Sequence, residues 1–246
     1  EEIIDLLLSS GCWPFVKQRP YDVVANPGRK PKSIFISGYA SAPLATDIDY
    51  ILDGKERELQ AAIIALNKLT PGNIHVSIGK NGTSPFEGLD NIEIHRVSGP
   101  HPIGNVSTQI AKIDPINKGE VVWTLAPQDL IIIGELLLSG KLNASRTIAL
   151  AGSRVAEPKY YTTKIGASMS SIVAKKLIDG SNRIISGNVL TGRKETAKGC
   201  LGFYHDMVTV VPEGDDYELF GWTTPVFNKI STTRALTFSW LFPNKK

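Results

Sequence analysis

The stretch KSIFISGYA, residues 32–40, decides the fold class of this chain. Apolar β-forming residues fill its centre on both faces. The run LQAAIIALNKL follows at 59–69, with Leu59, Ile63 and Leu66 aligned at helical spacing. A short run that is apolar on both faces is typical of a strand buried between two layers of helices. A buried strand followed by an amphipathic helix therefore predicts an α/β fold.

The same alternation of strand and helix continues in both directions along the chain. The further expected elements are a helix over 1–10, strands over 73–80 and 91–99, a helix over 104–114, a strand over 121–125 and a helix over 127–140. Repeated units of this kind build a doubly wound sheet. Residues 1–142 are therefore predicted to form a mostly parallel sheet flanked by helices.

The pattern changes after Asn143. The expected order there is a hairpin of strands over 146–152 and 159–166, a helix over 169–177, a strand over 182–190, and β-rich segments over 207–214 and 217–222. A hairpin, a helix and a strand in this order are typical of a β-grasp unit. Residues 143–246 are therefore predicted to form a second domain. The apolar run at 236–242 favours a continuation of the chain that would cover it.

Composition excludes several classes of function. The 246 residues carry 27 basic and 24 acidic side chains, a net charge of +3, and the basic residues are scattered, which argues against a nucleic-acid partner. No apolar run approaches the roughly 20 residues of a membrane-spanning helix. Cys12 and Cys200 stand alone, with no second ligand at the spacing of a zinc or iron–sulfur site, so no metal site is predicted.

Motifs for the common enzyme chemistries are also absent from the sequence. It contains no GxGxxG, no GxxxxGK[ST] and no GxSxG, which disfavours a phosphate-cradling loop and a serine nucleophile. Histidine is the side chain best suited to acid–base work near neutral pH. His75 and His95 lie within predicted strands and are expected to be wall positions rather than catalysts, while His205 is expected in a polar turn. No catalytic residue is predicted.

The segment SSGCWPFVKQRPYD, residues 9–22, has the composition of a ligand-binding loop. Trp13 and Phe15 offer flat apolar surfaces, and Lys17 and Arg19 offer cations. Such a mixture suits a planar ring that bears polar oxygens. A second interpretation fits equally: a hydrophobic plug with two long basic side chains that packs the loop against the sheet or against a partner chain.

A second segment of interest is SGPHPIGNVSTQ, residues 98–109. His101 lies there, and Gly104 leads into a predicted helix whose first turn has backbone N–H groups able to receive an anion or a carbonyl oxygen. The alternative is a capping loop stiffened by Pro100 and Pro102.

Several stretches together resemble one known family. They are SSGCWPFVKQRPYD, SIFISGYASAPLATD, the run from Gly99 to Leu142, RTIALAGSRVAEPKYYTTKIGASM, NRIISGNVLTG and LGFYHDMVTVVPEGDDYELFGW. In this order they resemble the NqrA family, the A subunits of the sodium-translocating NADH:quinone oxidoreductases, over nearly the whole chain. That family is similar to the RnfC electron-transport subunits and to the flavin-binding subunit of respiratory complex I.

The resemblance implies a fold and a cellular setting. It implies a Rossmann-like domain at 1–142 followed by an SLBB-type β-grasp domain at 143–246, with a barrel-like domain before this chain and a helical domain after it. It also implies a peripheral subunit on the cytoplasmic side of the bacterial inner membrane, bound to the other subunits of a respiratory complex that exports sodium. Ubiquinone or menaquinone is the ligand that the family suggests.

One departure from the flavin-binding relatives bears on the ligand. They carry a glycine-rich loop after the first helix, where this chain has GCWPFVKQRPYD, residues 11–22, and their iron–sulfur cysteine ligands have no counterpart. We therefore expect no tightly bound cofactor and no independent catalytic activity. Quinone contact is expected from Trp13, Phe15, Lys17 and Arg19, with His101 as a further donor. The alternative is a structural module that binds partner subunits and has no ligand of its own.

Overall fold

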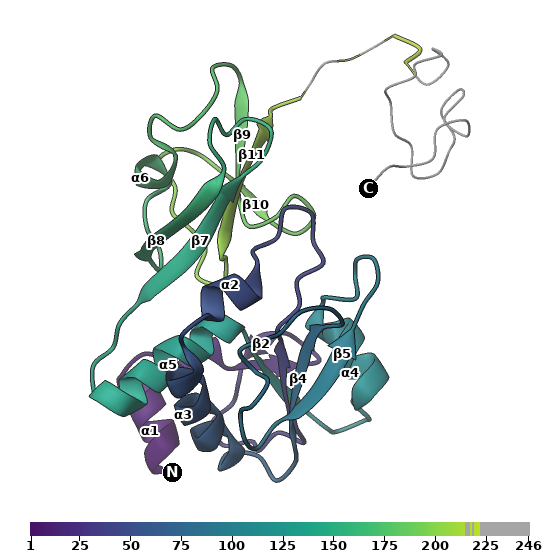
Figure 1. Ribbon diagram of the computed structural model, residues 1–246, viewed down its shortest axis with the longest axis vertical. Coiled ribbons are helices and arrows are strands. Elements are labelled where there is room, and N and C mark those ends of the chain that lie inside the picture. The colour runs from purple at the N-terminus through teal and green to yellow at the C-terminus, as the bar shows by residue number, and fades with distance from the viewer. Residues whose placement is uncertain (215–216, 218, 222–246) are drawn as a thin grey trace. The chain divides into compact units, whose positions relative to one another are not determined.

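The first of two sheets, sheet A, has six strands in the order β2-β1-β6-β3-β4-β5 (Figure 1). Our computed structural model describes residues 1–214, 217 and 219–221. Strands β3 to β6 run parallel to one another, whereas β1 is antiparallel to both β2 and β6. The strands are β1 (Lys17–Arg19), β2 (Val23–Val24), β3 (Ile34–Ser37), β4 (Ile74–Gly79), β5 (Glu93–Val97) and β6 (Val122–Leu125).

Helices cover both faces of sheet A, as Figure 1 shows. Ile34 and Ile36 of β3 belong to the larger core with the helices α1, α3 and α5, while Phe35 between them packs with Ile110 of α4 on the opposite face. This division explains why β3 is apolar on both sides, and it confirms the predicted α/β class. The helices are α1 (Glu2–Ser9), α2 (Ile48–Leu52), α3 (Glu56–Asn67), α4 (Val106–Ile113) and α5 (Pro127–Ser139).

The second sheet, sheet B, has five strands in the order β10-β9-β11-β7-β8. Only the β7–β11 pair is parallel among its described pairings. Ile148 of β7 and Val208 of β11 pack against Met169 and Ile172 of α6. The predicted order of hairpin, helix and strand is thus observed. The elements are β7 (Ser145–Ala151), β8 (Lys159–Lys164), α6 (Met169–Val173), β9 (Asn182–Ser186), β10 (Arg193–Glu195) and β11 (Met207–Pro212).

Three sequence-based expectations for this half of the chain need comment. Helix α6 ends at Val173, before the predicted 177, because the backbone leaves the helical region at Ala174, with a ψ of 125°, and Lys175 follows with a left-handed φ of 57°. Within the predicted β-rich segment 217–222, the described residues 217 and 219–221 are not in a strand. The apolar run at 236–242 lies outside the described residues.

The predicted ligand loop at 9–22 is more regular than its sequence indicated. A short 3₁₀ helix (Trp13–Phe15) leads into β1, whose Gln18 pairs with Val23 of β2 on one side and with Trp123 of β6 on the other. Three polar residues, Lys-Gln-Arg, lack the apolar alternation by which a strand is usually recognised. Strands β1 and β2 were therefore not predicted.

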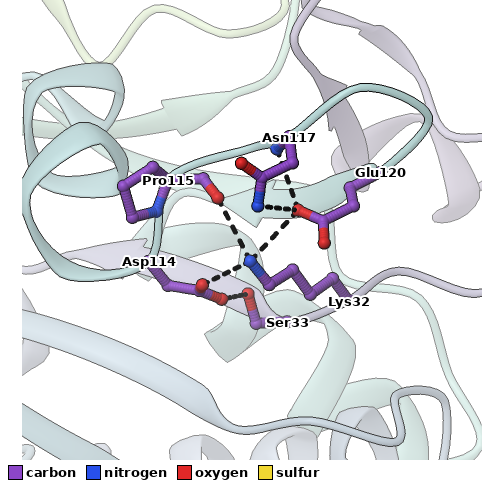
Figure 2. Close-up of polar contacts among 6 residues, drawn as sticks. All are labelled: Lys32, Ser33, Asp114, Pro115, Asn117 and Glu120. Atoms are coloured by element: carbon purple, nitrogen blue, oxygen red, sulfur yellow. Dashed lines mark hydrogen bonds and ion pairs between the residues drawn. The ribbon is translucent and has the colours of Figure 1, made fainter.

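A network of polar contacts holds the beginning of β3 to the segment between α4 and β6 (Figure 2). The Lys32 ammonium lies 2.5 Å from Oδ1 of Asp114 and 3.1 Å from Oε2 of Glu120. The Ser33 hydroxyl donates to Asp114 at 3.0 Å, and the backbone N–H of Asn117 donates to Glu120 at 2.9 Å. The Pro115 carbonyl also accepts from Lys32, at 3.1 Å, so polar groups of six residues from two distant segments of the sequence meet here.

The same contacts shift the pKa values of the charged groups. Burial alone would raise the pKa of Asp114, but hydrogen bonds from Lys32 and Ser33 hold it below its usual value. The Asn117 backbone N–H and Lys32 lower the pKa of Glu120, and both carboxylates raise the pKa of Lys32. The network is therefore fully charged near neutral pH.

Replacing Lys32 with methionine is expected to remove a stabilising contribution that depends on pH. A carboxylate whose pKa is lowered by folding stabilises the folded state at pH values above its ordinary pKa of about 4. This stabilisation is lost as the pH falls through the pKa that the group has in the folded state. Urea unfolding between pH 3 and pH 7 should show wild type more stable than Lys32→Met at neutral pH, with the two curves converging toward pH 3. A difference in unfolding free energy between the two proteins that stays constant with pH would contradict this account.

Candidate functional site

A cleft of about 560 Å³ opens at the carboxyl ends of β3 and β6. Strand β4, the next parallel strand along the chain, lies on one side of β3, and β6 lies on the other side. The strand order therefore reverses between β3 and β6. Ligands of open α/β sheets bind at such switch points. The residues that line the cleft include Phe15, Lys17, Arg19, Asp22, Ser37, Ser41, Gly104, Asp129 and Tyr204.

Two cations from β1 form one wall of the cleft. Lys17 Nζ lies 2.6 Å and Arg19 Nη2 lies 3.1 Å from the same oxygen of Asp22, Oδ1. The Lys17 ammonium also lies 4.6 Å from the centre of the Tyr204 ring. The Tyr204 hydroxyl donates to the Pro14 carbonyl at 2.9 Å, and burial raises the pKa of Tyr204. The two cations share the Asp22 carboxylate, and the carboxyl groups of Asp129 and Asp206 line the same cleft.

The aromatic residues of segment 9–22 have different places in the structure. Phe15 belongs to the core of sheet A and is only 3% exposed, but its ring also borders the cleft and stacks on Phe203, with ring centres 5.2 Å apart. Trp13 is buried in the core of sheet A, where its indole N–H donates to the Ala25 carbonyl at 2.7 Å and its ring meets Trp123 edge to face. Trp13 is not among the residues that line the cleft, so for this side chain the plug interpretation fits better.

The opposite wall carries hydroxyl groups and a close backbone contact. Ser41 Oγ accepts a hydrogen bond from the Gly104 N–H at 2.9 Å and lies 3.1 Å from Nδ1 of His101. Ser37 Oγ donates to the Gly104 carbonyl at 2.9 Å. A Cβ atom on Gly104 would lie 2.6 Å from the Ser41 nitrogen, which explains a glycine here. His101 contacts the cleft through Ser41 rather than lining it.

Asp129 forms part of the cleft floor and pairs with Arg146 of β7. Both side chains are 3% exposed. Burial raises the pKa of Asp129 to about 6, against the opposing attraction of Arg146. Arg146 Nη1 also donates to the Phe203 carbonyl at 2.7 Å. The pair therefore connects α5 to β7 and to the segment that carries Phe203 and Tyr204.

The remaining histidines only partly match their predicted roles. His205 lies in a turn, half-buried, with Nδ1 2.7 Å from the Ser186 hydroxyl, and burial lowers its pKa. His75 and His95 are strand residues as predicted, but together with Glu93 they form a cluster that the sequence analysis missed. The register of β4 against β5 creates this cluster, and a strand pattern alone does not define register.

Among the described residues, none of the helices is both long enough and apolar enough to cross a membrane.

Comparison with known proteins places the chain in a family. Residues 1–142 match the family model described as NqrA second alpha/beta domain, and residues 147–197 match the model described as NQRA C-terminal domain. The A subunit of the Na(+)-translocating NADH-quinone reductase of Neisseria meningitidis serogroup B is 39% identical over 236 residues, which cover 96% of this chain and 53% of that protein. The corresponding subunit of Yersinia pestis is 38% identical over 246 residues, covering 100% and 55%. The chain therefore spans about half the length of these curated relatives.

Solved structures show a likeness of fold only. An NAD+-reducing NiFe-hydrogenase in the air-oxidized state superposes with a TM-score of 0.60 at 14% identity, over 86% of this chain and 46% of that one. The two family models together identify this chain as a member of the NqrA family, the A subunits of the Na(+)-translocating NADH-quinone reductases.

Proposed function

We propose that this chain acts as part of the A subunit of a Na(+)-translocating NADH-quinone reductase and that its cleft receives the headgroup of a quinone. In this proposal residues 1–142 are a Rossmann-like domain whose flavin site has been lost, and the following domain is a β-grasp unit. The subunit lies peripherally on the cytoplasmic side of the bacterial inner membrane, bound to the other subunits. It serves quinone access and assembly and performs no electron transfer itself.

The observation that carries the proposal is the meeting of Phe15, Lys17 and Arg19 in one cleft at the strand switch point. A quinone is a flat apolar ring with two carbonyl oxygens, and it needs aromatic surface together with a few hydrogen-bond donors. The cleft volume of about 560 Å³ lies within the range of small-ligand sites.

The backbone of β1 favours a quinone over a nucleotide. A phosphate-binding loop presents free backbone N–H groups to its ligand. Here Lys17 and Gln18 pair with β2 on one side and with β6 on the other, so their backbone is engaged within sheet A. Donors at this wall are therefore side chains, which suit a carbonyl oxygen.

A partner-binding role without a ligand is the alternative, and the edge of sheet A favours it. Tyr21 is 81% exposed, and Val23 and Val24 of the edge strand β2 are exposed as well. An exposed apolar edge strand is suited to contact with another chain. Cross-links from residues 21–24 to another subunit of the complex would support this role.

Quinone binding is testable by calorimetric titration of a short-chain ubiquinone into the full chain. Hydrogen bonds from charged donors contribute roughly 1.5–3 kcal/mol, so Lys17→Gln and Arg19→Gln are each expected to weaken binding about tenfold or more. Lys159→Gln is the matched control, because Lys159 is exposed on β8 and does not line the cleft. Absence of saturable binding, or equal affinity in all four proteins, would contradict the proposal.

A further inference from the structure

Three potential metal ligands converge at the outer edge of sheet A, away from the residues that line the cleft. Nδ1 of His75 lies 3.0 Å from Nε2 of His95 and 3.1 Å from Oε2 of Glu93. The three ligand atoms all lie within 4.8 Å of one another. His75 belongs to β4, and Glu93 and His95 are alternate residues of β5.

Strand register brings the three side chains to one face. His75 is directly opposite Glu93, and Ser77 is opposite His95, in the parallel pairing of β4 with β5. Residues two apart on a strand point to the same side of the sheet, so His75, Glu93 and His95 share a face. β5 is the edge strand of sheet A, and the half-exposed Glu93 side chain gives solvent access to the cluster.

Protons can satisfy this arrangement only by sharing, with one Nδ1–H as a bifurcated donor to both neighbours. Nδ1 of a neutral imidazole carries either one proton or one lone pair. When Nδ1 of His75 carries a proton, that one proton faces both Oε2 of Glu93, at 3.1 Å, and Nε2 of His95, at 3.0 Å. When Nδ1 carries a lone pair and accepts from His95, the lone pair faces the Glu93 carboxylate. A single cation at the common centre would satisfy all three atoms at once.

The surroundings hold the potential ligands in place. The amide of Asn73 donates to the other carboxylate oxygen of Glu93, Oε1, and leaves Oε2 directed at His75. The ring of His75 packs on Phe35, with centres 4.7 Å apart, and its side chain is 8% exposed. The Glu93 side chain is 49% exposed, so an ion and a water molecule have access from solvent. Outer contacts of this kind orient the ligands in metal sites.

We propose that His75, Glu93 and His95 bind one divalent transition-metal ion, with Zn²⁺ as the preferred ion, and that the ion joins the edge strand β5 to β4. Two imidazole nitrogens and one carboxylate oxygen suit Zn²⁺, whose fourth position would be filled by water. Bonds of about 2.0–2.2 Å in a tetrahedron place ligand atoms about 3.3–3.6 Å apart, so the 3.0 and 3.1 Å separations from His75 Nδ1 would have to widen by a few tenths of an ångström to admit the ion. The role assigned to the ion is structural.

The proposal is tested by titrating Zn²⁺ into the metal-free full chain by calorimetry, and Co²⁺ by visible absorption. One equivalent is expected to bind with a micromolar dissociation constant and to raise the melting temperature, since the ion binds the folded state. His95→Gln and Glu93→Gln, both at solvent-accessible positions, are each expected to weaken binding at least about 100-fold, and Asn73→Ala about tenfold.

Three controls cover the histidine and cysteine side chains outside the cluster, apart from Cys12, which is buried. His101→Gln, His205→Gln and Cys200→Ser should bind Zn²⁺ as wild type does. Circular dichroism of each metal-free variant verifies its fold before titration. The proposal is overturned if Zn²⁺ binds more weakly than millimolar to wild type, or if folded His95→Gln and Glu93→Gln retain wild-type affinity.

Discussion

Replacing Asp129 with alanine is expected to lower the free energy of unfolding by about 3–5 kcal/mol. The variant would leave the Arg146 guanidinium, whose side chain is 3% exposed, buried without its carboxylate partner. Arg146 would keep its hydrogen bond to the Phe203 carbonyl but not a counter-charge. Urea unfolding at neutral pH, followed by circular dichroism, measures the loss.

The control for this prediction is an ion pair on the surface. Glu157→Ala removes the partner of Lys159, and both side chains are largely exposed, at 80% and 53%. Exposed pairs contribute little, so this variant should unfold at the wild-type urea concentration. Equal behaviour of Asp129→Ala and Glu157→Ala would show that the buried pair does not stabilise the link between α5 and β7.

Replacing Gly134 with alanine is the second change with a large expected effect. A Cβ atom at this position would lie 1.9 Å from the Glu58 carbonyl oxygen and 2.5 Å from its carbon. Helices α5 and α3 could accommodate it only by moving apart, because the clashing atoms belong to the backbone. We expect a loss of about 1–3 kcal/mol or more, even though alanine is the better helix former by about 1 kcal/mol.

Gly28→Ala is the matched control for the glycine variant. Its Cβ atom would meet only the Asn26 side chain, at 3.4 Å, which is ordinary contact. Urea unfolding should therefore show Gly28→Ala near wild type and Gly134→Ala clearly destabilised. A Gly134→Ala protein as stable as wild type would mean that the two helices are not held at this close approach.

The elements that were predicted correctly are those whose burial is visible in the sequence. Strand β3 is apolar on both faces and α3 has an apolar stripe, because each contacts a hydrophobic core. Strand β1 was missed because its side chains, Lys17, Gln18 and Arg19, form no apolar pattern. Its pairing with β2 and β6 rests on backbone hydrogen bonds, which the sequence does not show.

The candidate site shows a similar limit. Composition indicated that Phe15, Lys17 and Arg19 could meet a ligand, and all three line the cleft. It could not separate them from Trp13, since the direction of an aromatic side chain depends on tertiary packing. The cluster around His75 depends on strand register, a long-range property that local patterns do not encode.

Photolabelling with a quinone that carries a photoreactive group tests the central claim most directly. The full chain would be irradiated with the probe, with and without excess unlabelled ubiquinone, and labelled peptides mapped by mass spectrometry. We expect labelling within segments 15–22, 37–41 or 104–107, or at Tyr204, that the competitor abolishes. Labelling confined to other surfaces, or unaffected by the competitor, would contradict quinone binding in the cleft.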